Sequence, residues 1–207
     1  KAARIDVPGE GPLYFGSLGD ALDYAAGMEQ SPVTVEVLED ITDETIEVKP
    51  VKTPSNSIIL DLNGNEIKEP SSLYVEKGAD LTLKGGTVSA PVTNEGNLTN
   101  QGEISGDVVQ KDGTFTNESD AVTKKIIQDG GKIVNEGQIG TVEISGGEYE
   151  GKPADSTNRT GAKVEVTKKN PDGTTTTTYY PSVKDALDNT EGDATLKLLE
   201  DLKEDKA

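Results

Sequence analysis

Three asparagines recur at a fixed place in the sequence, and their side chains are the first candidates for chemistry. Each lies four residues after a glycine: Asn100, Asn117 and Asn135 follow Gly96, Gly113 and Gly131. If the chain coils with this period, the three side chains stack at one corner, on coils ~4.8 Å apart. Stacked amides can hydrogen-bond from coil to coil, which would make them structural. Alternatively, the same polar row binds sugar hydroxyls.

Three glutamates form the second candidate set. Glu95, Glu118 and Glu136 each follow an asparagine, in the strings NEG or NES. A column of like charges repels itself unless solvent or a cation lies between the carboxylates. Hard oxygen ligands suit Ca²⁺, so the set is either a row of solvated turns or a weak calcium site. No other cofactor is expected.

Catalytic groups are scarce. The chain has no His and no Cys, and the two arginines, Arg4 and Arg159, lie outside the central region. Polysaccharide lyases of the β-helix type need an Arg or Lys base, and the lysines hold no fixed place in the repeat. Glycoside hydrolases need two carboxylates at a set separation, and no such pair is recognisable. The sequence therefore predicts a protein that is not an enzyme, with cleavage of polysaccharides as the residual alternative.

Charge and composition narrow the partners. The 38 acidic and 20 basic residues give a net charge of −18. Nucleic acid is excluded as a partner because proteins bind it largely through Lys and Arg. No apolar stretch approaches the ~20 residues that span a bilayer, so no membrane insertion is expected in this segment. The low apolar content of 32% suits a thin solenoid with a narrow core.

The glycine period indicates the element that positions these side chains. Five glycines lie 18, 17, 18 and 16 residues apart: Gly78, Gly96, Gly113, Gly131 and Gly147. Regular self-similarity at a short period is typical of a solenoid, here of about six coils built from short strands. An apolar residue lies two positions after each of the last four glycines: Leu98, Phe115, Ile133 and Tyr149. We expect Leu98, Phe115 and Ile133 to point inward in one vertical stack.

The start of the chain predicts a cap of strand, turn, helix and strand. Residues 4–7 alternate in strand fashion, and residues 33–38 read as a strand with one polar face. Between them, Ser17 is placed to cap a helix and Gly27 to end it.

The same order returns near the end of the chain. Three blocks match, namely residues 4–7 with 163–166, residues 17–23 with 182–188, and residues 37–41 with 198–202. We therefore expect an α/β cap over residues 1–45, coils over 46–151, a linker over 152–161, and the truncated opening of a second repeat unit over 162–207. The natural protein is expected to continue with more copies.

The second cap is expected to dock on the last coil near Tyr149. The threonine run at residues 174–178 is interpreted as part of a hairpin and as an edge strand that could pair with another chain.

The strings YFGSLGDALDYA, VTVEVLEDI and SIILDLNGNEI, with later GGTV and NEG turns, resemble a family of bacterial surface-protein repeats. That family is similar to right-handed parallel β-helices of the pectate-lyase-like type. The resemblance covers residues 14–151 and restarts at Tyr180. It implies an all-β, right-handed parallel β-helix and a location outside a bacterial cell, at its surface or wall. It also implies tandem copies as partners, with glycans or host surface proteins as possible ligands.

From these expectations together, the sequence predicts a non-enzymatic structural or adhesive module of a large repetitive bacterial surface or secreted protein. The alternative is a β-helix protein that binds or cleaves carbohydrate.

Overall fold

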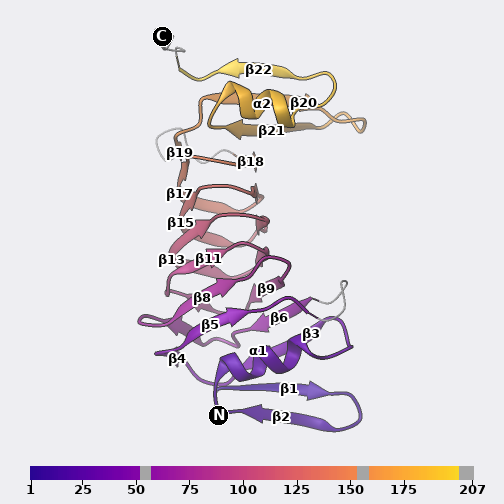
Figure 1. Ribbon diagram of the computed structural model, residues 1–207, viewed down its shortest axis with the longest axis vertical. Helices are drawn as coiled ribbons and strands as arrows, with labels where there is room; N and C mark the ends of the chain where they lie inside the picture. Colours follow the sequence, from indigo (N-terminus) through magenta and orange to yellow (C-terminus); the bar gives the residue numbers. More distant parts are fainter. Residues whose placement is uncertain (52–56, 153–158, 201–207) are drawn as a thin grey trace.

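The protein is a parallel β-solenoid of about five turns, with a small helix near each end of the stack (Figure 1). The computed structural model describes residues 1–51, 57–152 and 159–200. The N-terminal strands and strand β22 (Thr195–Leu198) lie at opposite ends of the long axis. The all-β solenoid predicted from the glycine period is confirmed, with about five turns in place of the expected six.

One long sheet runs the whole length of the stack. Its pairing is parallel from β3 to β18 and antiparallel at both ends. In spatial order its twelve strands are β2 (Gly11–Phe15), β1 (Ala3–Val7), β3 (Val33–Val37), β6 (Ile58–Asp61), β9 (Asp80–Lys84), β12 (Asn97–Asn100), β14 (Thr114–Asn117), β16 (Lys132–Asn135), β18 (Glu148–Gly151), β21 (Thr175–Tyr180), β20 (Val164–Lys169) and β22 (Thr195–Leu198).

The second sheet closes the coils. It starts as two stacks of short parallel strands, which are β4 (Ile41–Thr42), β7 (Glu66–Lys68) and β10 (Thr87–Val88), and β5 (Thr45–Val48), β8 (Ser72–Val75) and β11 (Val92–Asn94). The stacks merge in β13 (Glu103–Gln110) and continue through β15 (Val122–Gln128), β17 (Gln138–Ile144) and β19 (Arg159–Thr160). A register shift between Ile104 and Asp107 marks the former corner between them.

The core is a narrow column formed by the inward side chains of each strand, stacked from coil to coil. Along β14, Phe115 and Asn117 are buried while Thr114 and Thr116 remain half-exposed, the alternation of a strand with one solvated face. Leu98 pairs in register with Phe115, and Phe115 pairs with Ile133. The predicted inward stack is therefore confirmed.

The glycine column differs from the prediction at its first member. The backbone amide that follows each repeat glycine donates to the equivalent carbonyl of the preceding coil. Asn97 donates to Ala79 in this way, and Thr114 donates to Gly96. The position equivalent to the later glycines is therefore Ala79 and not Gly78. A Cβ on Gly113 would lie 2.0 Å from the carbonyl oxygen of Gly96, and the residue has φ +65°. Glycine recurs here because successive coils touch backbone to backbone.

The first cap covers the N-terminal end of the column. Its helix α1 (Leu18–Ala26) begins after Ser17, whose hydroxyl accepts from the Asp20 amide, and ends at Gly27, as predicted. The buried face of α1 packs against β3 and β5. Because β3 also pairs with β6, the cap is continuous with the coils.

The second cap repeats this arrangement, with α2 (Val183–Asn189) in the place of α1. Its register corrects the sequence match by two residues. The Lys163 amide donates to Tyr180, as the Ala2 amide does to Phe15, so Lys163 corresponds to Ala2 and not to Arg4. Strand patterns repeat every two residues, so a two-residue slip preserves which side chains face the core and is invisible in the sequence.

The second cap docks on the last coil, as predicted. Strand β21 pairs antiparallel with β18, and Tyr149 lies opposite Tyr179 with ring centroids 6.0 Å apart. The hydroxyl of Tyr180 donates to Glu148 over 2.9 Å.

The threonine run forms a hairpin with β20, as interpreted. Strand β21 pairs with β18 only at Thr178 and Tyr179, so no strand in the described part of the chain covers the other edge of Thr175–Thr177. Pairing of that edge with another chain stays a prediction. Most of the expected linker, residues 153–158, lies outside the described part of the chain. So do residues 201–207, which include the last two residues of the third matched block.

Candidate functional site

The three recurring asparagines form a ladder inside the solenoid. The amide of Asn100 donates to Oδ1 of Asn117 over 3.1 Å, and that of Asn117 donates to Oδ1 of Asn135 over 3.1 Å. The amide of Asn135 in turn donates to the hydroxyl of Tyr149 over 3.0 Å. All three asparagines are buried. The ladder therefore bonds four successive coils to one another.

The remaining bonding capacity of the ladder is used by the turns beside it. Oδ1 of Asn100 accepts from the Gly102 amide over 3.0 Å, and Oδ1 of Asn135 accepts from the Gly137 amide over 3.1 Å. Each asparagine also donates to a backbone carbonyl of the neighbouring corner. Because these amides are buried and bonded, they offer no polar row to a sugar in solvent.

A second column of buried amides lies at the other corner and was missed by the sequence reasoning. Asn94, Gln110 and Gln128 are in register on β11, β13 and β15, and all are buried. The Asn94 amide donates to Oε1 of Gln110 over 2.7 Å, while the side-chain amides of Gln110 and Gln128 donate to backbone carbonyls. The only sequence signal is a terminal amide residue at the ends of VTN, VVQ and IIQ, because the residue type changes between coils.

The three glutamates do not form one column, which corrects the predicted arrangement. Glu118 and Glu136 follow the asparagine ladder, where their amides donate to Asn100 and Asn117. Glu95 follows β11 at the other corner, where its amide donates to Val75. Asparagine ends strands of both sheets, so the string NEG occurs at two different corners.

Glu95 is engaged locally rather than with the other glutamates. Its carboxylate accepts from the hydroxyl of Tyr74, and this bond together with burial raises the pKa of Tyr74 to about 12. Within residues 1–51, 57–152 and 159–200, no three acidic side chains gather as metal ligands.

Arg4 lies in the first cap, and Arg159 lies on β19 at the last coil. Arg4 pairs with Glu36 over 2.7 Å on the outer face of the long sheet. The guanidinium of Arg159 lies 3.7 Å from the ring centre of Tyr179, a cation–π contact at the junction of coil and second cap. Both arginine side chains are thus engaged in contacts within the protein.

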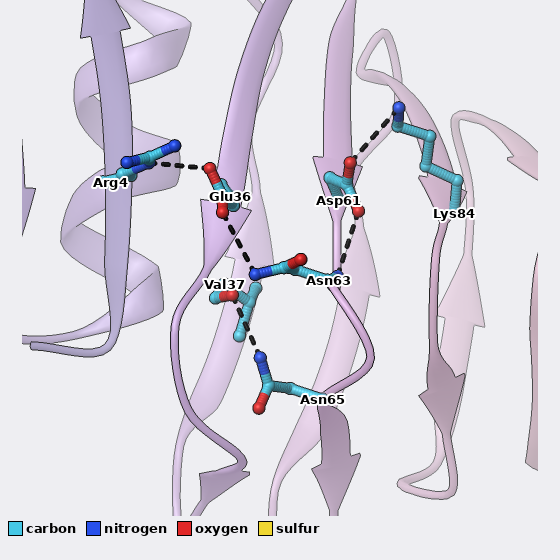
Figure 2. A network of polar contacts seen from close by, with 7 residues as sticks. All are labelled: Arg4, Glu36, Val37, Asp61, Asn63, Asn65 and Lys84. Carbon is cyan, nitrogen blue, oxygen red and sulfur yellow. Dashed lines mark hydrogen bonds and ion pairs between the residues drawn. The ribbon is translucent and has the colours of Figure 1, made fainter. Parts of the chain in front are cut away.

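A polar network explains the LDLNG string (Figure 2). Oδ1 of Asp61 accepts from the Asn63 amide over 3.0 Å, which tightens the turn after β6, and Asp61 pairs with Lys84 of β9. On the other side, the side-chain amide of Asn63 donates to the carboxylate of Glu36 over 3.1 Å. The amide of Asn65 donates to the carbonyl of Val37 over 3.1 Å. The string therefore fastens β6 to the strand before it and to the strand after it.

One hollow that could receive a ligand lies at the junction of the last coils with the second cap. It has a volume of about 420 Å³ and is lined by Glu136, Glu150, Lys152 and Thr175–Thr177, among others. Glu150 is already paired with Lys132 over 2.6 Å. The lining is polar and mixed in charge, which suits a hydroxylated ligand better than an apolar one.

No helix in the described part of the chain is long and apolar enough to cross a bilayer. No family model, curated protein or solved structure matches the chain.

Proposed function

We propose that this chain is a non-enzymatic structural module, one segment of a rod in a large repetitive protein secreted by a bacterium or held at its surface. The observation that carries the proposal is the unbroken long sheet. It begins in the first cap, passes through every coil and continues through the second cap to β22. The long sheet of one repeat unit is therefore continuous with the first strands of the next unit.

Such a junction favours stiffness over a flexible linker. The second cap is joined to the last coil by strand pairing, by the tilted ring contact between Tyr149 and Tyr179, and by the hydrogen bond from Tyr180 to Glu148. In a solenoid each unit is stabilised by its neighbours, so stacked copies behave as one extended body. A stiff rod projects a binding domain away from a cell wall or presents a long face to a partner.

The proposed location rests on the resemblance of residues 14–151 to bacterial surface-protein repeats and on charge. A net charge of −18 keeps neighbouring rods soluble and apart.

The location is tested by antibodies raised against the purified chain. We expect them to label intact cells of the source bacterium or its culture medium, and mild protease treatment of whole cells to remove the cell-bound signal. Labelling confined to lysed cells would sink the proposal.

Carbohydrate binding is the second candidate, and the polar hollow at the junction is the observation that favours it. Its threonine hydroxyls and carboxylates are groups that bind sugar hydroxyls. A glycan array probed with the labelled chain tests this candidate, with Thr176→Val and Glu136→Gln as variants of the hollow. Saturable binding lost in these variants would make the module adhesive, and binding unchanged by them would place the ligand elsewhere.

A further inference from the structure

The C-terminal end of the stack exposes apolar side chains that the fold elsewhere buries. Leu187 of α2 is 61% exposed, and Leu196 and Leu198 of β22 are 39% and 50% exposed. Together, the free edge of β22 and this face of α2 form what we call the end face.

The first cap shows what covers the same positions. By the internal repeat, Leu187 corresponds to Leu22, Leu196 to Val35, and Leu198 to Val37. These three equivalents are at most 1% exposed. They are covered because β3 pairs in parallel with β6 and because α1 packs against β5 and β6. The end face therefore corresponds to the surface of the first cap on which the first coil packs, but here no coil packs on it in the described part of the chain.

The backbone of β22 is oriented for the same pairing. The Leu199 amide donates to Lys163 of β20, as the Leu38 amide donates to Ala2. Backbone groups alternate along a strand, so the amides of Leu196 and Leu198 point to the free edge. In the first cap the corresponding edge of β3 pairs with β6, and the Val33 amide donates to the carbonyl of Ser57 just before β6.

Charge specifies the strand that fits. Arg4 and Glu36 form a cross-strand pair in the first cap, and Glu165 and Lys197 occupy those two positions in the second, with the charges exchanged. In the first cap Glu36 lies in register beside Asp61, so two acids are neighbours. At the end face Lys197 would lie beside that aspartate instead, which converts a repulsion into an attraction.

We propose that the end face is the docking surface for a parallel strand of the β6 kind, supplied by a further copy of the repeat in the same polypeptide. Two alternate apolar residues of that strand, like Ile58 and Leu60, cover Ala194 and Leu196. An aspartate in the position of Asp61 lies beside Lys197, and an asparagine in the position of Asn65 donates to the carbonyl of Leu198. The inference rests on the proposed role in tandem arrays and names the contact that joins one copy to the next.

The test extends the full chain by its own repeat. Residues 42–207 are attached after Leu202, so Leu198 occurs twice, once at the internal junction and once at the terminal end face. Leu198→Asp at the internal copy should lower the Tm by about 5 °C or more, whereas the same change at the terminal copy should leave the Tm unchanged. Hydrogen exchange should be slow at the internal amides of Leu196 and Leu198 and fast at the terminal ones.

The charge argument has its own matched variants. At the internal junction Lys197→Glu should lower the Tm, and adding Glu165→Arg should restore part of the loss by recreating the pair of the first cap. At the terminal end face neither change should matter. Equal effects at both junctions, or fast exchange at both, would overturn the proposal.

Two other outcomes are separable. If the 207-residue chain dimerises and protects the β22 amides only as a dimer, the end face joins separate molecules and the assignment within one polypeptide fails. If the appended coils fold but the internal β22 stays unprotected, docking fails while a string of folded modules survives. Absence of the protein from the cell surface and medium would instead defeat the proposed function and leave the docking result intact.

Discussion

Phe115 lies in the middle of the inward column, between Leu98 and Ile133, and is fully buried. Phe115→Ala should cost about 3–5 kcal/mol in the free energy of unfolding, because the ring leaves a cavity that two backbone-packed coils cannot close. Thr116→Ala, its outward neighbour, is the matched control and should change stability by less than ~0.5 kcal/mol. Chemical denaturation of the three proteins measures both values, and similar costs at both positions would place Phe115 outside the core.

Gly113 is required by contact between coils rather than by flexibility. Its added Cβ would meet the Gly96 carbonyl oxygen at 2.0 Å, and its φ of +65° is unfavourable for side chains. Gly113→Ala should therefore lower the Tm strongly or prevent folding. Gly16→Ala, where nothing lies within 4 Å of the new methyl group, should be tolerated. Thermal melts followed by circular dichroism compare the two, and equal melts would contradict the backbone-contact account.

Structural positions could be predicted from the sequence where the same residue type recurs in each coil, and could not where the residue type changes. The inward column and the Asn100, Asn117 and Asn135 spacing were readable because glycine marks each coil at nearly constant distance. The second column of buried amides was hidden by the change from Asn94 to Gln110. Glu95 was grouped with Glu118 because a string of three residues does not reveal which corner it occupies.

At the scale of elements, the junction between β18 and β21 depends on a buried tyrosine. Burial, followed by the hydrogen bond to Glu148, raises the pKa of Tyr180 above its ordinary value. The folded state thus favours the neutral phenol. Its stabilisation is complete below the unfolded pKa of ~10 and is lost as the pH rises above it towards the folded pKa.

We expect alkaline pH to weaken this junction. Tyr180→Phe removes the ionisable group, so its stability should fall less than that of the unchanged chain between about pH 9 and pH 11. The pKa values of Tyr74 and Tyr179 are also raised, so both proteins should lose some stability and the difference between them reports Tyr180. Thermal melts across this pH range measure the difference, and parallel curves would show that Tyr180 does not titrate with folding.

Element order was more predictable than element pairing. The helix starting after Ser17 and the strand–helix–strand caps followed from local signals. The second cap was expected to dock near Tyr149, but the antiparallel pairing of β21 with β18 did not follow, because a strand pattern specifies neither the partner strand nor the direction of pairing. Threonine-rich strands suit exposed edges, and Thr175–Thr177 keep one edge unpaired where β21 extends past its contact with β18.

At the scale of the whole molecule, the distribution of charged groups argues against catalysis. The arginines contact residues of the caps, and Glu150 in the junction hollow is paired with Lys132. The pKa of Lys132 is raised by its hydrogen bond with Glu150, which holds it protonated and unsuited to act as a base.

We therefore expect no cleavage of pectin, alginate or related polyuronates, with or without added Ca²⁺. Ultraviolet absorbance of unsaturated products detects lyase activity, and a reducing-end assay detects hydrolysis. Lys132→Ala is the informative variant, because a lyase signal that vanished with it would overturn the non-enzymatic account.

The central claim is that consecutive repeats continue one solenoid. Nine strands of the long sheet, from β2 to β18, precede the point at which β21 begins the next unit. At ~4.8 Å per strand, each added repeat should lengthen the molecule by ~43 Å. Small-angle X-ray scattering of proteins with one, two and three repeats measures this increment directly. The account predicts a rigid rod whose maximum dimension grows by ~43 Å per repeat, and a smaller increment or the scattering of a flexible string would contradict it.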